Sequence, residues 1–229
     1  MKFGVVVFPG SNCDMDMVYV LETIMKQEVV RLWHKDTNLQ QCDFIILPGG
    51  FSFGDYLRSG AIARFSPIMS EIIGFANAGG YVMGICNGFQ ILTESGLLPG
   101  ALLNNNSHKF ICKNIYLKTI TKNTLVTNSY TSSVIKAPIA HAEGKYFADE
   151  PTLRSLIKND QILFKYCNED GDFINDANPN GSLMNIAGVC NYERNVFGMM
   201  PHPERASDKE LSNQDGRGLF ESILNNVLS

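Results

Sequence analysis

The first half of the 229-residue chain alternates apolar runs with segments of helical spacing. The runs at residues 2–8, 29–33, 44–47 and 81–85 predict strands, and the segments at residues 14–25, 66–78 and 87–94 predict helices, the first capped by Asp14. Strands that alternate with helices form right-handed crossovers and a parallel sheet. We therefore predict an α/β fold with an open, largely parallel sheet and helices on both faces.

The second half is richer in strand signals. Strands are predicted at residues 110–117, 134–139, 162–166, 186–190 and 196–200, a loop at 168–185 and a last helix at 215–228. We expect some of these strands to extend the sheet and others to form a small antiparallel extension. No repeat or linker interrupts the sequence, so we predict a single domain over residues 1–229.

Composition excludes several classes of protein. The net charge of −4 carries no run of like charge, so wholesale nucleic-acid binding is not expected. No apolar run approaches the roughly 18 residues that a membrane span needs, so we expect no membrane association. The six cysteines form no CxxC pair, which favours reduced thiols in the cytoplasm over disulfides or a metal site.

The pattern G-x-C-x-G at residues 84–88 lies where the fourth predicted strand meets a predicted helix. Such a turn lifts a nucleophile to the carboxyl edge of the sheet, and small flanking residues let strand and helix approach closely. The helix N-terminus favours a Cys86 thiolate, and the Asn87 amide is placed to stabilise an oxyanion. A buried cysteine at a tight turn is the alternative.

The segment at residues 200–205 supplies a base for this nucleophile. Prolines on both sides fix the backbone at His202. Glu204, two residues on, points to the same side of an extended segment and can orient the ring. The alternative is a surface turn with an incidental histidine.

The glycine pair in the loop at residues 48–56 lets backbone amides approach a ligand. We predict that the Gly50 region supplies the second oxyanion donor beside Asn87. Read alone, the same loop is equally consistent with a plain turn.

Together these motifs resemble the class I, or triad, glutamine amidotransferases, in which a Cys-His-Glu triad matches Cys86, His202 and Glu204. Gln90 matches a glutamine at the substrate pocket of that family. The resemblance is closest to the glutaminase subunits of phosphoribosylformylglycinamidine synthase. The blocks that carry it are FPGSNCD at 8–14, GGFSFGDYLR at 49–58, GICNGFQ at 84–90, HAEG at 141–144, NPNGS at 178–182 and MPHPER at 200–205.

The resemblance implies a glutaminase that hydrolyses L-glutamine through a cysteine thioester. It passes ammonia to a large synthetase subunit, which makes formylglycinamidine ribonucleotide in purine synthesis, while a small subunit bridges the two. It also implies that His141 and Glu143 hold the substrate, although a solvated loop is an alternative for both. Asp55 and Arg58 are expected to contact the partner.

No cofactor is expected in this chain, because it carries no nucleotide-binding loop, and ATP and Mg²⁺ are expected in the synthetase. We expect weak glutaminase activity from the isolated chain and an enclosed path for ammonia into the partner. Three other readings stay open. One is a glutaminase that feeds a different synthetase, and another is a redox or protease-like member of the wider fold. The third is a purely structural subunit with a vestigial triad, which the presence of all three triad residues disfavours.

Overall fold

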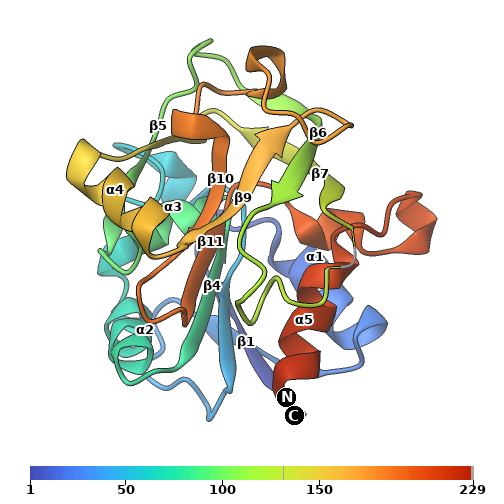
Figure 1. The fold of residues 1–229 in the computed structure, drawn as a ribbon. Helices are drawn as coiled ribbons and strands as arrows, with labels where there is room; N and C mark the ends of the chain where they lie inside the picture. The colour runs from blue at the N-terminus through green and yellow to red at the C-terminus, as the bar shows by residue number, and fades with distance from the viewer. Residues whose placement is uncertain (131, 228–229) are drawn as a thin grey trace.

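The computed structural model describes residues 1–130 and 132–227. Its centre is a nine-stranded sheet in the order β2-β1-β3-β4-β11-β10-β9-β6-β7. Figure 1 shows α2, α3 and α4 on one side of this sheet and α1 and α5 on the other. The predicted α/β class, with an open, largely parallel sheet and a small antiparallel extension, is confirmed.

The parallel half of the sheet contains β2, β1, β3, β4 and β11, at Glu28–Trp33, Lys2–Val7, Phe44–Leu47, Tyr81–Ile85 and Val196–Met199. Helices cover both faces of these strands, which is why β3 and β11 are apolar and buried at every position. Because the strands run in the same direction, the loops that follow β1, β3, β4 and β11 meet at one edge of the sheet.

The second half of the sheet is antiparallel and continues from β11. It contains β10, β9, β6 and β7, at Ile186–Cys190, Ile162–Cys167, Ile111–Thr119 and Val134–His141. Two short strands, β5 and β8, form a separate antiparallel pair at Ala101–Leu103 and Lys145–Phe147.

Five α-helices are described, α1 to α5, at Asp14–Tyr19, Pro67–Asn77, Asn87–Glu94, Glu150–Lys158 and Arg217–Val227. The first predicted helix does reach residue 24, but its second half, Val20–Ile24, is a turn of π-helix. The predicted end of the last helix at Leu228 lies outside the described residues. No described helix is long and apolar enough to cross a membrane.

One prediction of local structure is wrong, and one helix was not predicted. Cys13, not Asp14, occupies the N-cap position of α1, and the Asp14 carboxylate lies 3.3 Å from the Arg31 guanidinium instead. Sequence periodicity also missed α4, which buries only Leu156. Its signals are at its start, where the Asp149 carboxylate accepts a hydrogen bond from the Thr152 amide and a proline occupies the first turn.

Candidate active site

Cys86 occupies a strained turn between β4 and α3. Its φ of 49° and ψ of −105° lie outside the regions that L-residues normally adopt. The side chain is 4% exposed, and its Sγ lies 3.7 Å from the Ala140 carbonyl oxygen of β7. A strained backbone of this kind, fixed between a strand and a helix, is the geometry of a nucleophile elbow.

The glycines of the elbow are required by the packing. A Cβ atom on Gly84 would lie 2.5 Å from the Gly88 carbonyl carbon, and one on Gly88 would overlap the Leu47 carbonyl oxygen of β3. The small residues of the G-x-C-x-G pattern therefore let α3 pack directly on β3 and β4. Asn87, as the first residue of α3, has no carbonyl acceptor within the helix for its amide.

His202 and Glu204 form a buried pair beyond the end of β11. His202 Nδ1 lies 2.6 Å from Glu204 Oε1, and the two residues are 1% and 2% exposed. Burial alone would lower the pKa of His202. The Glu204 carboxylate and then Cys86 outweigh burial and raise this pKa well above its usual value. The His202 amide donates to the Pro138 carbonyl of β7, which fixes the backbone.

The second nitrogen of the ring is available for chemistry. His202 Nε2 and Glu204 Oε2 are both buried, and neither has a hydrogen-bond partner among residues 1–130 and 132–227. The Cys86 thiol is close enough to affect the pKa of the ring. The structure thus brings the three residues of the predicted triad together from the ends of β4 and β11.

The glycine loop after β3 lies against this pair. A Cβ atom on Gly49 would lie 2.6 Å from the His202 Cε1 atom, so only glycine fits there. Gly50 has a φ of +130°, and a Cβ atom on it would lie 2.6 Å from the Asn12 amide nitrogen. The loop backbone therefore reaches the site itself.

The Asn87 side chain ties this loop to the elbow, a role that sequence reasoning did not assign. Its Oδ1 accepts a hydrogen bond from the Ser52 amide at 3.1 Å. Its Nδ2 donates to Gln90 Oε1 at 2.9 Å and to Asp55 Oδ1 at 3.3 Å. Asn87 is 2% exposed, so these contacts are shielded from water.

Gln90 and Glu143 lie beside each other. Gln90 Nε2 donates to the Glu143 carbonyl, and Glu143 Oε2 accepts from the Ser59 amide at 2.9 Å. These bonds position the loop and the segment after β7. Contact of either side chain with substrate stays a prediction.

His141, the last residue of β7, is buried and held by Asn105. Asn105 Oδ1 accepts from the Gly144 amide and lies 3.1 Å from His141 Nδ1, which therefore carries the ring proton. Burial, followed by the nearby His202, lowers the pKa of His141 to about 4. His141 is thus neutral at neutral pH.

Asp55 and Arg58 lie in the same loop as Ser52. Burial, with the like charge of Glu143, raises the pKa of Asp55 to about 6. The exposed Arg58 guanidinium makes a two-bond ion pair with Glu94 at 2.8 and 2.6 Å. Contact of either residue with a partner stays a prediction.

A cavity of about 160 Å³ opens beside the triad histidine. It is lined by Asn12, Cys13, Gly50, Phe51, Phe110, Ala140, His202 and Arg205. Of these residues, Gly50 and His202 were predicted as site residues from the sequence, whereas the others, Cys13 and Arg205 among them, were not. Cys13 follows β1 and so lies at the edge where the other site loops meet, and that placement could have identified it.

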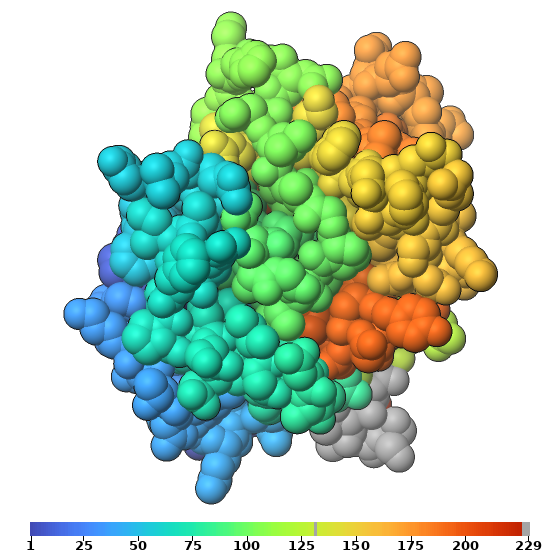
Figure 2. Space-filling view, turned by 90° about the vertical axis from the view of Figure 1, so that its left-hand side faces the viewer, coloured from blue at the N-terminus to red at the C-terminus, as the bar shows by residue number. Residues whose placement is uncertain are grey.

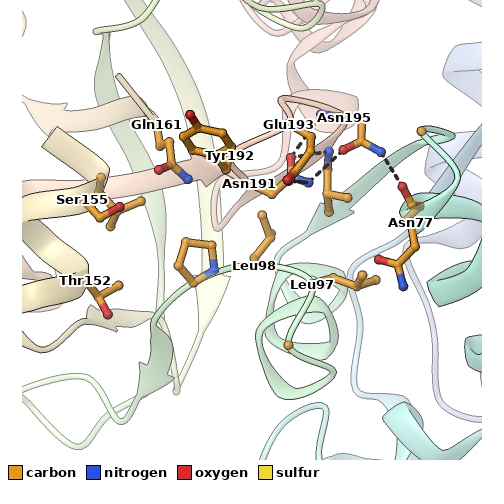
Figure 3. Close-up of a pocket in the computed structure, with 16 residues that line it drawn as sticks. Asn77, Leu97, Leu98, Thr152, Ser155, Gln161, Asn191, Tyr192, Glu193 and Asn195 are labelled. Carbon is orange, nitrogen blue, oxygen red and sulfur yellow. Dashed lines mark hydrogen bonds between the residues drawn. The ribbon is translucent and has the colours of Figure 1, made fainter. Parts of the chain in front are cut away.

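A larger cavity, of about 560 Å³, lies elsewhere (Figure 3). Gly79 and Val196 in its wall lie at the starts of β4 and β11, whereas Cys86 and His202 follow the ends of these strands. Figure 2 shows the face of the molecule on which the green, yellow and orange segments that line this cavity lie next to one another. Several of its amides, such as Asn195 Nδ2, bond backbone carbonyls, so we assign the chemistry to the smaller cavity.

Comparison with known proteins agrees with this site. The sequence profile of a family described as a CobB/CobQ-like glutamine amidotransferase domain matches residues 1–219. The PurQ subunit of phosphoribosylformylglycinamidine synthase from Koribacter versatilis is 55% identical, with 98% of this chain and 97% of the relative covered. The Synechocystis PurQ subunit is 56% identical over 96% of this chain and 99% of its own length.

Solved structures give the same relationship. A chain in the structure of PurLQS from Thermotoga maritima has a TM-score of 0.86 and 43% identity, with 99% of this chain and 98% of that chain covered. A glutamine amidotransferase from Thermotoga maritima, with a TM-score of 0.60 and 14% identity over 99% of this chain and 91% of that chain, shares the fold. The predicted family is therefore confirmed: the chain belongs to the CobB/CobQ-like glutamine amidotransferases and, among them, to the PurQ subunits of phosphoribosylformylglycinamidine synthase.

Proposed function

We propose that residues 1–229 act as a single glutaminase domain that releases ammonia from L-glutamine, with Cys86 as nucleophile, His202 as acid and base, and Glu204 as the group that orients His202. The observation that carries the proposal is the strained turn at Cys86 beside a buried His202–Glu204 pair. A thiol, an imidazole and a carboxylate in this order form the general arrangement of a cysteine nucleophile with an oriented base.

The electrostatics of the site favour a reactive thiolate. The N-terminus of α3 places the positive end of its dipole at Cys86. The raised pKa of His202 favours an imidazolium, which stabilises a neighbouring thiolate. Glu204 holds the Nδ1 proton, so the Nε2 position is directed to the reacting atoms.

The reaction then proceeds in two steps. The Cys86 thiolate attacks the side-chain carboxamide of glutamine, and the Asn87 and Gly50 amides stabilise the oxyanion. His202 protonates the leaving nitrogen, which departs as ammonia. Water, deprotonated by His202, hydrolyses the thioester and releases glutamate.

The cavity beside His202 supports this assignment because it is small and adjoins the triad. Its wall includes Gly50 and Ala140, and the backbone carbonyl oxygen of Ala140 lies 3.7 Å from Cys86 Sγ. We propose that the glutamine side chain enters here, with Gln90, His141 and Glu143 shaping the pocket behind the elbow.

We also propose the destination of the ammonia. In the cytoplasm, the chain delivers it to a large synthetase subunit, which uses ATP and Mg²⁺ to convert formylglycinamide ribonucleotide to the amidine, and a small subunit bridges the two. The rim of the site supports a docking role, since Tyr56, Leu57 and Phe65 are 69%, 80% and 73% exposed. Large exposed apolar side chains that cluster on one loop region are typical of interaction surfaces.

Labelling with a diazoketone analogue of glutamine tests the nucleophile. The unmodified protein should be alkylated at Cys86 and lose activity, and glutamine should protect it. Equal labelling of Cys86→Ala would refute the assignment. Mixing the chain with the synthetase subunits, ATP and formylglycinamide ribonucleotide tests the destination, because glutamine should then support amidine formation. Glutamine hydrolysis without amidine formation would agree with the proposed triad and would refute only the proposed acceptor of the ammonia.

A further inference from the structure

A second thiol lies beside the triad histidine. Cys13 Sγ, a ring nitrogen of His202 and a carboxylate oxygen of Glu204 all lie within 4.8 Å of one another. The three residues are 3%, 1% and 2% exposed. The glutaminase chemistry described above gives Cys13 no role, although the residue lines the same small cavity as His202.

One polar atom of this cluster has neither a partner nor a part in the chemistry described above. Glu204 Oε2 makes no hydrogen bond to any residue in the part of the chain that the structure describes. An unpaired polar atom in the interior is costly, and such atoms are frequently explained by a ligand or an ion. Thiolate sulfur, imidazole nitrogen and carboxylate oxygen together are the ligand types that zinc takes.

We propose that Cys13, His202 and Glu204 form a binding site for Zn²⁺, and that occupancy of this site reversibly inhibits the triad. The binding site itself does not depend on the proposed glutaminase activity. The inhibition does rest on it, because it assumes that His202 must accept and donate protons.

The spacing of the atoms is compatible with zinc after shifts of roughly 1 Å. Bond lengths of about 2.0–2.3 Å in a tetrahedral site place the ligand atoms about 3.5 Å apart. The three atoms of the cluster, at most 4.8 Å apart, would have to close by roughly 1 Å. Glu204 Oε1 is 2.6 Å from Nδ1, so this pair would have to open by roughly 1 Å for the ion to enter between the two groups and Cys13. A water molecule from the cavity can fill the fourth position.

The local charges also permit a dication. Arg205 Nη2 donates to Cys13 Sγ at 3.2 Å, and Arg205 Nε is 2.9 Å from Asp16 Oδ2. The Arg205–Asp16 pair is close to neutral, and the Cys13 thiolate and the Glu204 carboxylate balance the two charges of zinc. Arg205 would then act as a hydrogen-bond donor to a metal-bound thiolate, which is a common outer-shell arrangement.

Binding through Nδ1 would remove the base. The Cys13 thiol and the Nδ1–H group of the His202 imidazolium each lose one proton to solvent, the zinc ion takes the freed Nδ1 lone pair, and the ring keeps one proton on Nε2. With Nδ1 bonded to metal and Nε2 already protonated, His202 can no longer accept a proton from Cys86 or from water. Glu204 is likewise occupied and no longer stabilises an imidazolium.

Cobalt(II) in place of zinc tests the site directly, because a thiolate ligand gives cobalt a charge-transfer absorption band. The Cys86→Ala chain should give this band and lose it when Zn²⁺ is added. Cys13→Ala in the same background should bind cobalt and zinc at least about 100-fold more weakly, since loss of an outer-shell partner alone costs 10- to 100-fold. Cys112→Ala, which removes an exposed thiol, is the matched control and should keep the band.

Several results would overturn the proposal. The metal uses a different thiol if the band persists when Cys13→Ala is added to the Cys86→Ala chain. The same conclusion follows if the unmodified protein gives the band and the Cys86→Ala chain does not. Zinc X-ray absorption of the Cys86→Ala complex needs no change at Cys13, and it should show one sulfur ligand at about 2.3 Å. A first shell without sulfur would refute the site even if the Cys13 variants fail to fold.

Activity tests the inhibitory part separately. In the assembled complex, Zn²⁺ should lower glutamine hydrolysis, a chelator should restore it, and Cys13→Ser should need at least about 100-fold more zinc for the same fractional loss. Equal zinc sensitivity of Cys13→Ser would refute the inhibition. If no variant hydrolyses glutamine at any zinc concentration, the proposed function fails while the cobalt measurement still decides the site.

Discussion

Replacing Asn87 by alanine tests how the glycine loop is held against the elbow. The Asn87 side chain bonds the Ser52 amide at 3.1 Å, Gln90 Oε1 at 2.9 Å and Asp55 Oδ1 at 3.3 Å. Alanine removes all three bonds but leaves the residue's backbone amide, the first proposed oxyanion donor, in place. The second proposed donor, Gly50, lies two residues before Ser52, so it should lose its support.

The expected magnitude follows from these contacts. The Ser52 amide is buried, and leaving such a donor unpaired costs about 1–3 kcal/mol. The loop relieves this cost by moving toward water, which carries the Gly50 amide away from the oxyanion. Loss of one oxyanion donor lowers kcat by about 10²–10³. We therefore expect a fall of about 100-fold in kcat and a loss of about 1–3 kcal/mol in the free energy of unfolding.

The assay is glutamate release at saturating glutamine by the assembled complex, together with urea unfolding of the isolated chain. Ser52→Ala is the matched control, because it keeps the backbone amide that Asn87 binds. The Ser52 hydroxyl is buried and has no hydrogen-bond partner among the described residues, so its removal should change neither kcat nor stability by much.

The outcome that contradicts this reasoning is specific. If Asn87→Ala is folded and its kcat stays within about threefold of the unmodified protein, the side chain does not position an oxyanion donor. If Ser52→Ala loses as much activity as Asn87→Ala, the loop acts through the serine hydroxyl instead.

Glu204→Gln should lower kcat by about 10- to 150-fold, because a hydrogen bond to a charged group contributes about 1.5–3 kcal/mol. The free energy of unfolding should fall as well, because the buried His202 ring loses the charge that offsets its burial. Unchanged turnover would refute the orienting role. Gly88→Ala should destabilise the chain by about 1–3 kcal/mol or more in urea unfolding, because its Cβ would overlap the Leu47 carbonyl, whereas Gly74→Ala, with open space around it, is the control. Burial and Glu143 raise the folded-state pKa of Asp55 to about 6, so the folded chain binds more protons than the unfolded chain between about pH 4 and 6. The free energy of unfolding therefore falls as pH rises through this window, and Asp55→Asn should remove the part of the fall that Asp55 causes. Parallel pH profiles of stability for the variant and the unmodified protein would contradict this. The isolated chain should hydrolyse glutamine slowly and speed up when the synthetase subunits are added; full turnover without them would argue that the pocket is already complete.

Sequence alone was sufficient wherever the physical cause is local. The apolar runs predicted the strands because a buried strand must be apolar at every position, as Phe44–Leu47 is. The G-x-C-x-G pattern predicted the turn at Cys86 because close helix–strand packing leaves no room for a Cβ at Gly84 and Gly88. His202 and Glu204 are two residues apart, so their pairing also follows from short-range geometry.

Weak local signals explain the missed elements. The helix α4 has one buried side chain, Leu156, so its sequence shows no apolar stripe. The Asp149 cap does mark its start, but a capping residue alone is equally common in turns. Likewise, strand propensity could not say which of the later strands join the main sheet, because pairing between distant strands is set by packing.

The tertiary structure decided which residues share the site. Cys13, Gly49 and His202 follow three different strands, and only the parallel order β1-β3-β4-β11 brings the ends of these strands to one edge. Antiparallel β7 then places the Ala140 carbonyl at Cys86 Sγ, a contact between residues 54 positions apart. The reactive residues could be predicted from the sequence because their spacing is short and fixed by covalent geometry. The second thiol beside His202 and the Asn87 contacts to Ser52 and Asp55 join residues from separate loops. Only the folded sheet brings these loops next to one another.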